Sequence, residues 1–162
     1  MKHILVPTDF SNASKTAFAF ARKQAELLGK ETVKVTLFAV LEDLIPASVQ
    51  FEFGLTFIDS KGLLDEAEKQ AEKRIEGYRL EYFKDLNVET RIVRAMHPVH
   101  AEIKDFIKKN VVDLVIMATH GRTGIRHLVL GSVTERVVRE ATCPVLVVPS
   151  MDESSAKGAG KS

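Results

Sequence analysis

Cysteine is almost absent from this sequence of 162 residues, in which Cys143 is the only one. A single cysteine excludes an intrachain disulfide and any metal site made of cysteines alone. The sequence also lacks an apolar run long enough to span a membrane. In the opening MKHILVPTDF the apolar run ends at Pro7, which is too short for the hydrophobic region of a signal peptide. We therefore expect a cytoplasmic protein without a membrane span.

An excess of charge of either sign is missing as well. The 23 basic and 22 acidic residues leave a formal net charge of +1, which supplies no broad field to attract nucleic acid or an anionic membrane. We expect no nucleic-acid partner, and any anionic ligand has to be held by local geometry. With 45% hydrophobic residues, the chain is long enough and apolar enough to build the core of one domain.

Short runs of β-branched residues alternate with longer stretches of helical period. This alternation is typical of a parallel sheet covered by helices on both faces. Only the third run alternates between polar and apolar residues, so we expect the third strand to be more exposed than the others. The five predicted strands are His3–Pro7, Val33–Leu41, Val88–Ala95, Asp113–Ala118 and Pro144–Pro149.

Four helices are predicted between these strands. Ser11 or Asn12 can cap the first, which presents an apolar stripe and ends at Gly29. The second is long, charged and amphipathic, because its apolar residues recur every three to five positions. The last three helices are expected over Ser60–Asp85, Met96–Asn110 and Gly131–Ala141.

Two segments do not follow the α/β pattern. Glu42–Asp59 is an insertion with several aromatic residues, which either cap the domain core or cover a ligand or a partner. Ser150–Ser162 is small and polar, so we expect a disordered tail. The folded domain is therefore expected over residues 1–149.

A glycine-rich stretch, Met117–Thr134, leaves the fourth strand and enters the last helix. In an open α/β sheet, ligands bind at the carboxyl ends of the strands. Glycines let the backbone approach a ligand closely, and a helix that opens at Gly131 and Ser132 offers N–H groups and a positive dipole end to a phosphate. Glycines also end strands and cap helices, so the spacing alone leaves a purely structural role open.

The segments ILVPTDFS, MATHGRTGIRHLVLGSVTERV and CPVLVVP occur in this order and closely resemble the universal stress proteins over about residues 1–149. The resemblance implies an open, Rossmann-like parallel sheet with strand order 3-2-1-4-5. In the nucleotide-binding branch of that family, the loop pattern is Gly, two residues, Gly, nine residues, Gly, then Ser or Thr. Here the pattern falls on Ala118, Gly121, Gly131 and Ser132. Alanine replaces the first glycine. Its methyl group is tolerated if φ there is negative, but it could crowd the ribose or a phosphate if the contact is close.

By this resemblance the chain binds ATP, or AMP or ADP, with Mg²⁺ or Mn²⁺ carried by the nucleotide and no metal site of its own. Asp9 and Val40 would line the adenosine side, although Asp9 could instead cap the first helix. His120 and Arg122 could approach the phosphates or have only loop roles. The expected nucleotide-binding residues are Pro7, Thr8, Asp9, Val40, Met117, Ala118, His120, Gly121, Arg122, Gly131, Ser132, Val133 and Thr134.

Catalytic residues cannot be singled out, since the sequence shows neither a Ser-His-Asp order nor a distinct carboxylate pair. His97 and His100 lie near Glu102, but the sequence places no third metal ligand beside them. We expect a stress-response or signalling module that binds an adenine nucleotide, with slow, partner-dependent hydrolysis at most. The alternatives are a nucleotide-independent homodimeric interaction protein of the same family and, by analogy of fold alone, an adenylyl transferase.

An assembly is also expected from the last strand, Pro144–Pro149. The strand order that the resemblance implies makes it an edge strand with unpaired backbone groups on one side. Two copies of an apolar edge can satisfy these groups by pairing about a two-fold axis. We therefore expect a homodimer formed through this strand, the alternative being that Pro144 and Pro149 blunt the edge and the chain stays monomeric.

Overall fold

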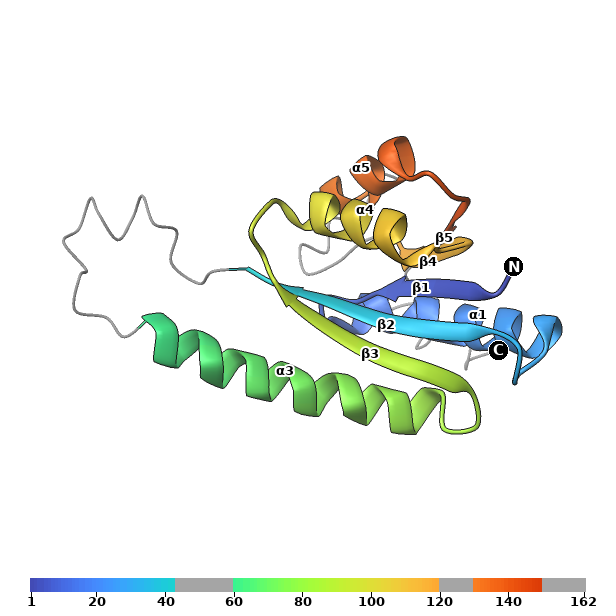
Figure 1. Cartoon of the computed structure of the whole chain (residues 1–162), viewed down its shortest axis with the longest axis horizontal. Coiled ribbons are helices and arrows are strands. Elements are labelled where there is room, and N and C mark those ends of the chain that lie inside the picture. The colour runs from blue at the N-terminus through green and yellow to red at the C-terminus, as the bar shows by residue number, and fades with distance from the viewer. Residues whose placement is uncertain (43–59, 120–129, 150–162) are drawn as a thin grey trace, which may run out of the picture.

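The computed structural model describes residues 1–42, 60–119 and 130–149. Strands and helices alternate along these residues (Figure 1). The described strands are β1 (His3–Pro7), β2 (Lys34–Leu41), β3 (Asn87–Arg94), β4 (Leu114–Ala118) and β5 (Val145–Val148). The described helices are α1 (Asn12–Leu28), α3 (Ser60–Tyr82), α4 (Val99–Asn110) and α5 (Ser132–Glu140).

The five strands form one parallel sheet in the order β3-β2-β1-β4-β5, which confirms the predicted fold. In the centre of the sheet, Leu5 of β1 pairs with Thr36 of β2 on one side and with Val115 of β4 on the other. The chain builds outward from β1 through β2 to β3 and then crosses to β4 and β5. Strand order therefore reverses between β1 and β4, where an open sheet offers a crevice at its carboxyl edge.

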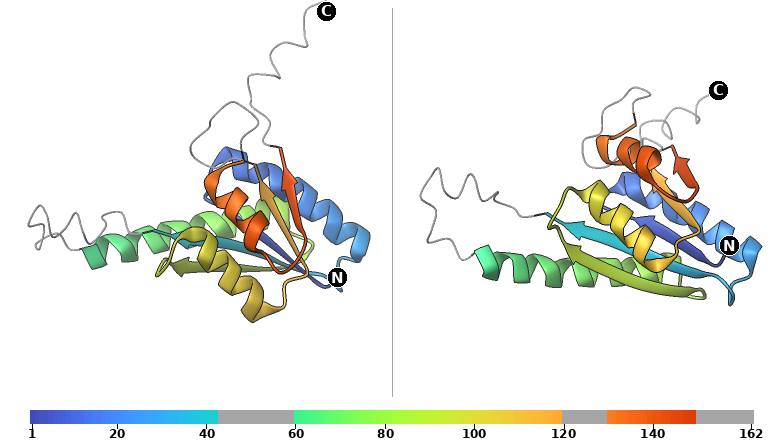
Figure 2. Two further views of the ribbon diagram at one scale, coloured as in Figure 1. Left: turned by 90° about the horizontal axis from the view of Figure 1, so that it is seen from above. Right: turned by 45° about the horizontal axis from the view of Figure 1, so that its top comes forward.

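The helices cover both faces of the sheet, α1 and α3 on one and α4 and α5 on the other (Figure 2). Since successive side chains of a strand point to opposite faces, β1 supplies both cores. Ile4 and Val6 pack toward α1 and α3, whereas Leu5 packs toward α4 and α5. The edge strand β3 is only half-buried, as its alternating sequence predicts.

Helix α1 begins at a serine N-cap and ends at a glycine. Ser11 is the N-cap, because its side chain accepts a hydrogen bond from the backbone N–H of Ser14. Four small or aromatic residues of the helix, Ala17, Phe18, Ala21 and Ala25, are fully buried against the sheet. At the other end Gly29 adopts φ +105°, a conformation that favours glycine. Of the two predicted caps, Ser11 is thus the one used.

Several predicted boundaries differ from the structure by one residue, and two helix ends differ by three. Helix α4 begins at Val99, three residues later than predicted, because the carboxylate of Glu102 accepts the N–H groups of Met96 and His97 ahead of the helix, each at 2.8 Å. Helix α3 ends at Tyr82, after which the N–H of Leu86 bonds to the carbonyl of Phe83 in a turn. Strand β5 is bounded by the two prolines that the prediction included. The predicted tail and most of the predicted insertion lie outside the described residues.

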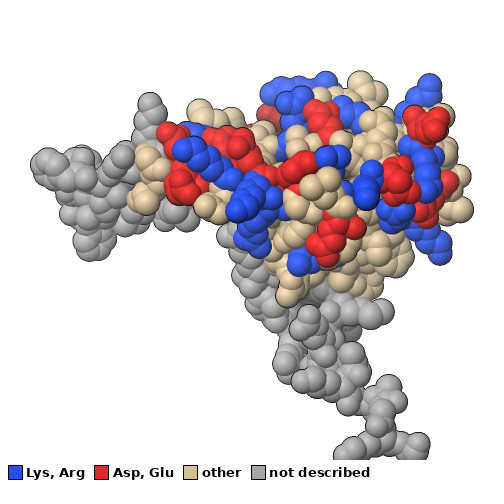
Figure 3. Space-filling model, turned by 90° about the horizontal axis from the view of Figure 1, so that it is seen from below, with Lys and Arg blue, Asp and Glu red and all other residues tan. Residues whose placement is uncertain are grey.

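Charged side chains of both signs are interspersed over the surface shown in Figure 3. This mixture agrees with the formal net charge of +1 and leaves local geometry to select an anion. Among the described residues, the structure contains no helix long and apolar enough to cross a membrane.

Candidate functional site

A pocket of about 720 Å³ opens at the carboxyl ends of the central strands. Pro7 from β1, Val40 from β2 and Ala118 from β4 line it, and so does Asp9, two residues after the end of β1. Gly131, just before α5, also lines the pocket. This position at the reversal of strand order is where open α/β sheets bind their ligands.

The pocket wraps around the carboxyl edge of the sheet and touches both core faces. Ile103 and Met117 belong to the core under α4 and α5, whereas Phe10 and Ala71 belong to the core under α1 and α3. The first turns of α3 therefore border the site, together with the segments on which the predicted residues lie. A ligand in this pocket can contact parts of the chain that are far apart in sequence.

Every predicted site residue that the structure describes lines this pocket. They are Pro7, Thr8, Asp9, Val40, Met117, Ala118, Gly131, Ser132, Val133 and Thr134. Three further predicted residues, His120, Gly121 and Arg122, lie outside the described residues. The fold thus brings together two groups of residues that come from opposite ends of the sequence.

Asp9 is held by the residue that caps α1. Its Oδ1 atom accepts hydrogen bonds from the backbone N–H of Ser11 at 3.0 Å and from the hydroxyl of Ser11 at 2.6 Å. The same hydroxyl oxygen accepts the N–H of Ser14 at 3.1 Å. Since Ser11 does the capping, Asp9 is not needed as the helix cap, and Ser11 instead fixes the orientation of the Asp9 carboxylate at the pocket wall.

Two predicted hydroxyl groups take part in buried hydrogen bonds within the protein. The Oγ1 atom of Thr8 lies 2.9 Å from the Oγ atom of Ser14 and accepts the N–H of Phe10 at 3.1 Å. The hydroxyl of Thr134 donates to the carbonyl oxygen of Ala118 at 3.0 Å. Both threonines are buried, so in this structure their side chains hold the loop after β1 and the start of α5 in place.

The start of α5 has the features of an anion site. Gly131 is its N-cap with φ −56° and ψ 148°, and no side-chain cap hydrogen bond is made there. The N–H of Gly131 donates to the carbonyl of Thr119 at 2.8 Å, which ties the cap to the end of β4. The first N–H groups of a helix carry the positive end of its dipole, so they are available to a negatively charged ligand group.

Ala118, which replaces the first glycine of the family pattern, is accommodated without backbone strain. It is the last residue of β4 and pairs with Val148 of β5. Among the described residues other than glycine, only Phe10 and Val111 have positive φ. The backbone at Ala118 therefore does not require glycine.

An unpredicted contact joins α3 to the loop after β1. Phe10 adopts φ +65°, and its carbonyl oxygen accepts hydrogen bonds from Nη2 of Arg74 at 2.9 Å and from the hydroxyl of Tyr78 at 3.3 Å. The guanidinium carbon of Arg74 also lies 5.0 Å from the centroid of the Phe10 ring. Arg74 lines the pocket. In the sequence, Arg74 places a cation between Ala71 and Ile75, on the apolar stripe of a predicted helix. This cation could have indicated the contact.

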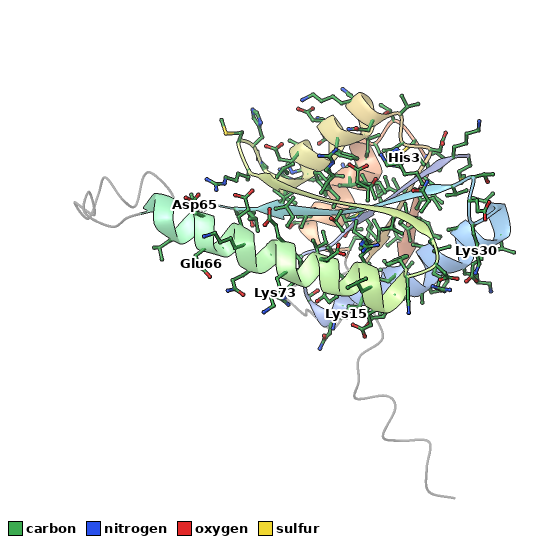
Figure 4. The ribbon with its side chains drawn as sticks, turned by 60° about the horizontal axis from the view of Figure 1, so that its bottom comes forward. His3, Lys15, Lys30, Asp65, Glu66 and Lys73 are labelled. Carbon is green, nitrogen blue, oxygen red and sulfur yellow. The ribbon has the colours of Figure 1, made fainter. Side chains whose placement is uncertain are left out.

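The beginning of α3 is held over the pocket by the last residue of β3. Arg94 bonds to Oδ1 of Asp65 at 2.5 Å and to Oε2 of Glu68 at 2.5 Å. These hydrogen bonds, first the one to Asp65 and then the one to Glu68, raise the pKa of Arg94 above its ordinary value. Figure 4 shows Asp65 and Glu66 on the first described turns of α3, at the opposite end of the molecule from Lys30.

Metal ligands do not gather among the residues that the structure describes. Within the ranges 1–42, 60–119 and 130–149, no group of three or more His, Cys, Asp or Glu side chains could hold an ion. The Nδ1 atom of His97 lies 3.4 Å from Glu102, whereas the Nε2 atom of His100 lies 3.9 Å from Glu140. The two histidines thus face different carboxylates.

The fold and the pocket define an open α/β domain with a pocket at its switch point. The profile of the Universal stress protein family matches residues 1–149, and the chain belongs to this family. Universal stress protein MJ0531 of Methanocaldococcus jannaschii is 34% identical over 152 residues, which are 91% of this chain and 81% of that protein. The solved structure of MJ0577 from the same organism superposes with a TM-score of 0.71 at 27% identity, over 94% of this chain and 98% of that one.

Three more distant structures share the fold and were solved with nucleotides. A protein of the family from Arabidopsis thaliana with bound AMP has a TM-score of 0.59 at 17% identity, over 95% of each chain. A universal stress protein in complex with cAMP has a TM-score of 0.56 at 21% identity, over 93% of this chain and 98% of that one. A universal stress protein from Archaeoglobus fulgidus in complex with dAMP has a TM-score of 0.53 at 20% identity, over 91% of this chain and 97% of that one.

Proposed function

We propose that this protein is a cytoplasmic universal stress protein that binds an adenine nucleotide and acts as a stress-response or signalling module. One observation carries the proposal: a single pocket joins Asp9, fixed after β1, to the uncapped amino end of α5 after β4. A nucleotide has both a hydrogen-bonding sugar and an anionic end, which these two elements suit. Binding of AMP, cAMP and dAMP by proteins of the same fold supports the choice of adenine.

The proposed orientation places the sugar at Asp9 and the phosphates at the start of α5. The Asp9 carboxylate accepts a hydrogen bond from a ribose hydroxyl, and Val40 packs against the adenosine. The phosphates lie against the N–H groups of Gly131–Thr134. At Gly131 φ is −56°, which any residue adopts, so the advantage of glycine there is the space that it leaves for a phosphate.

Binding rather than fast catalysis is the proposed role of the pocket. Hydrolysis of ATP needs a metal ion and a positioned water. Among the described residues that line the pocket, the carboxylates are those of Asp9 and Glu42, and Asp9 is assigned to the sugar. Mg²⁺ or Mn²⁺ would enter on the phosphate oxygens of ATP, which are hard ligands of the kind that these ions prefer. Hydrolysis is therefore expected to be slow at most.

Calorimetric titration with ATP, ADP and AMP tests the proposal, with Gly131→Val as the critical variant. The valine side chain would occupy the phosphate space without straining the backbone, so affinity should fall at least about tenfold while the thermal unfolding midpoint stays nearly unchanged. Gly77→Ala is the matched control, because Gly77 lies on α3 with open space beside it and does not line the pocket.

The same titrations can contradict the proposal. If none of the three nucleotides binds to the wild-type protein, and none is released from the protein as purified, the nucleotide-independent interaction protein becomes the better hypothesis. If ATP binds equally well to the wild-type and Gly131→Val proteins, the phosphates do not lie at the start of α5.

A further inference from the structure

Arg74 is the one cation among the described residues that line the pocket, where the other charged residues are Asp9 and Glu42. It comes from α3, which packs against the β2 and β3 side of the sheet. The start of α5 follows β4, on the other side of β1. The positive charge of Arg74 therefore lies across the pocket from the proposed phosphate site, next to the loop that carries Asp9.

The guanidinium of Arg74 is fixed in its place before any ligand binds. Its Nη2 atom donates to the carbonyl oxygen of Phe10 at 2.9 Å, and the group lies over the Phe10 ring. Tyr78 donates to the same carbonyl, and Arg94 anchors the beginning of α3. A positioned guanidinium loses little conformational entropy when it binds an anion.

This geometry leaves part of the guanidinium for a ligand. Arginine has five N–H donors in a planar fork, and the hydrogen bond that Arg74 makes to the described part of the chain uses only the Nη2 atom. The residue is exposed to solvent and lines the pocket. Its remaining donors suit a phosphate, which arginine binds with two parallel hydrogen bonds.

We infer that the pocket prefers adenine nucleotides with a second phosphate on the ribose 2′ or 3′ oxygen, and that Arg74 binds this phosphate. The inference rests on the proposed function, in which Asp9 contacts the ribose and the 5′-phosphates lie at α5. The ribose edge is then the part of the ligand that faces the Phe10 loop and Arg74. In other α/β sheets, an arginine at the ribose end of the site accommodates a 2′-phosphate.

A preference for nucleotides with a ribose phosphate needs the positive charge of Arg74. A ribose phosphate close to the carboxylate of Asp9 would be repelled by it, and a fixed cation beside the same loop compensates for that repulsion. A nucleotide without a ribose phosphate has no group for Arg74 to bind. Its affinity should therefore depend little on the charge at position 74.

Comparison of AMP with adenosine 3′,5′-bisphosphate and adenosine 2′,5′-bisphosphate tests the inference by calorimetric titration. The wild-type protein should bind one of the two bisphosphates at least about tenfold more tightly than AMP, and the two compounds decide between the 3′ and the 2′ oxygen. Arg74→Gln should abolish this preference, by lowering the affinity for the favoured bisphosphate at least about tenfold more than the affinity for AMP. Tyr78→Phe is the control, since it removes the other donor to Phe10 and keeps the charge.

Each outcome is decisive. If wild-type protein binds AMP at least as tightly as both bisphosphates, the inference is wrong while the proposed function stands, and this comparison needs no variant. An equal loss of affinity for all three ligands in Arg74→Gln, with Arg74→Lys behaving likewise, would show that Arg74 only holds the Phe10 loop. Absence of binding by ATP, AMP and the bisphosphates alike would overturn the proposed function as well.

Discussion

The hydroxyl of Thr134 donates a hydrogen bond of 3.0 Å to the carbonyl oxygen of Ala118 and so joins the first turn of α5 to the last residue of β4. Both residues are buried. The bond sets the amino end of α5 against the carboxyl edge of the sheet, where the proposed phosphate site lies. The same contact thus contributes to the stability of the domain and to the geometry of its pocket.

Thr134→Val should lower both the stability of the domain and its affinity for a nucleotide. Valine keeps the shape of the side chain but removes the donor, and a buried carbonyl that loses its partner costs about 1–3 kcal/mol of unfolding free energy. Urea titration measures this loss, and nucleotide affinity should fall with it. Thr16→Val is the control, because the hydroxyl of Thr16 bonds locally within α1 to the carbonyl of Ala13 at 2.7 Å. Equal losses of stability in both variants would contradict the role given to Thr134.

The strands and helices could be predicted because their determinants are local, whereas the strand order was predicted from the resemblance to the family. The predicted β1 agrees with the structure to the residue, and Ser11 caps α1 as one of two predicted candidates. The start of α4 was wrong by three residues. The N-cap of α4 is Pro98, and the carboxylate of Glu102 accepts the N–H groups of the residues before it. Composition alone does not determine at which residue the helix begins.

Only part of the candidate site could be predicted from the sequence, because the rest depends on contacts between residues far apart in the chain. Glycine spacing and the residues after β1 are visible in the sequence, and the structure gathers them in one pocket. The contact of Arg74 with Phe10 joins positions 64 residues apart and depends on the positive φ of a phenylalanine, which local propensity disfavours. The apolar residues that α3 contributes to the pocket look in the sequence like ordinary core positions.

Gly77→Ala is expected to stabilise the domain by about 1 kcal/mol. Gly77 lies inside α3, where alanine has the higher helix propensity, and a Cβ atom added there would meet no atom within 4 Å. Thermal or urea unfolding measures the gain. Gly29→Ala should have the opposite effect, since Gly29 has φ +105° and its added Cβ would lie 2.8 Å from Oγ1 of Thr32. Loss of stability in Gly77→Ala would contradict the open space beside α3.

Asp85 is expected to contribute to acid stability. It follows α3, and hydrogen bonds from Lys30 and then from Arg22 lower the pKa of its carboxyl from 3.8 to about 2. A carboxyl whose folded pKa is depressed stabilises the fold above its unfolded pKa and loses this contribution as the pH falls toward the folded value. The excess stability of wild type over Asp85→Asn should therefore be constant at neutral pH and disappear between pH 3.8 and about 2.

Urea unfolding of both proteins at a series of pH values measures this difference. Glu31→Gln provides the control, because Glu31 is exposed and makes no ion pair with the described residues. A difference between wild type and Asp85→Asn that stays constant from neutral pH to below 2 would contradict the assignment of the low pKa to the ion pairs of Asp85.

The edge strand β5 is predicted to pair with a second copy of itself. The carbonyls of Pro144 and Val148 accept hydrogen bonds from β4, so by alternation the backbone groups of Val145 and Val147 point away from β4. In the described part of the chain no strand pairs with this outer side. Antiparallel pairing about a two-fold axis would satisfy these groups and give a closed homodimer.

Val147→Pro tests this pairing without breaking the sheet of the monomer. Proline removes an N–H group on the outer side of β5, and an edge strand tolerates it because the bonds to β4 remain. Val148 would be a poor choice, since it is only 2% exposed within the monomer core. In light scattering coupled to size exclusion, the wild-type protein and Val147→Thr should have the mass of a dimer and Val147→Pro that of a monomer. A monomeric wild-type protein would exclude β5 as the interface, and a dimer that survives the proline would show that the N–H of Val147 does not hold the two copies together.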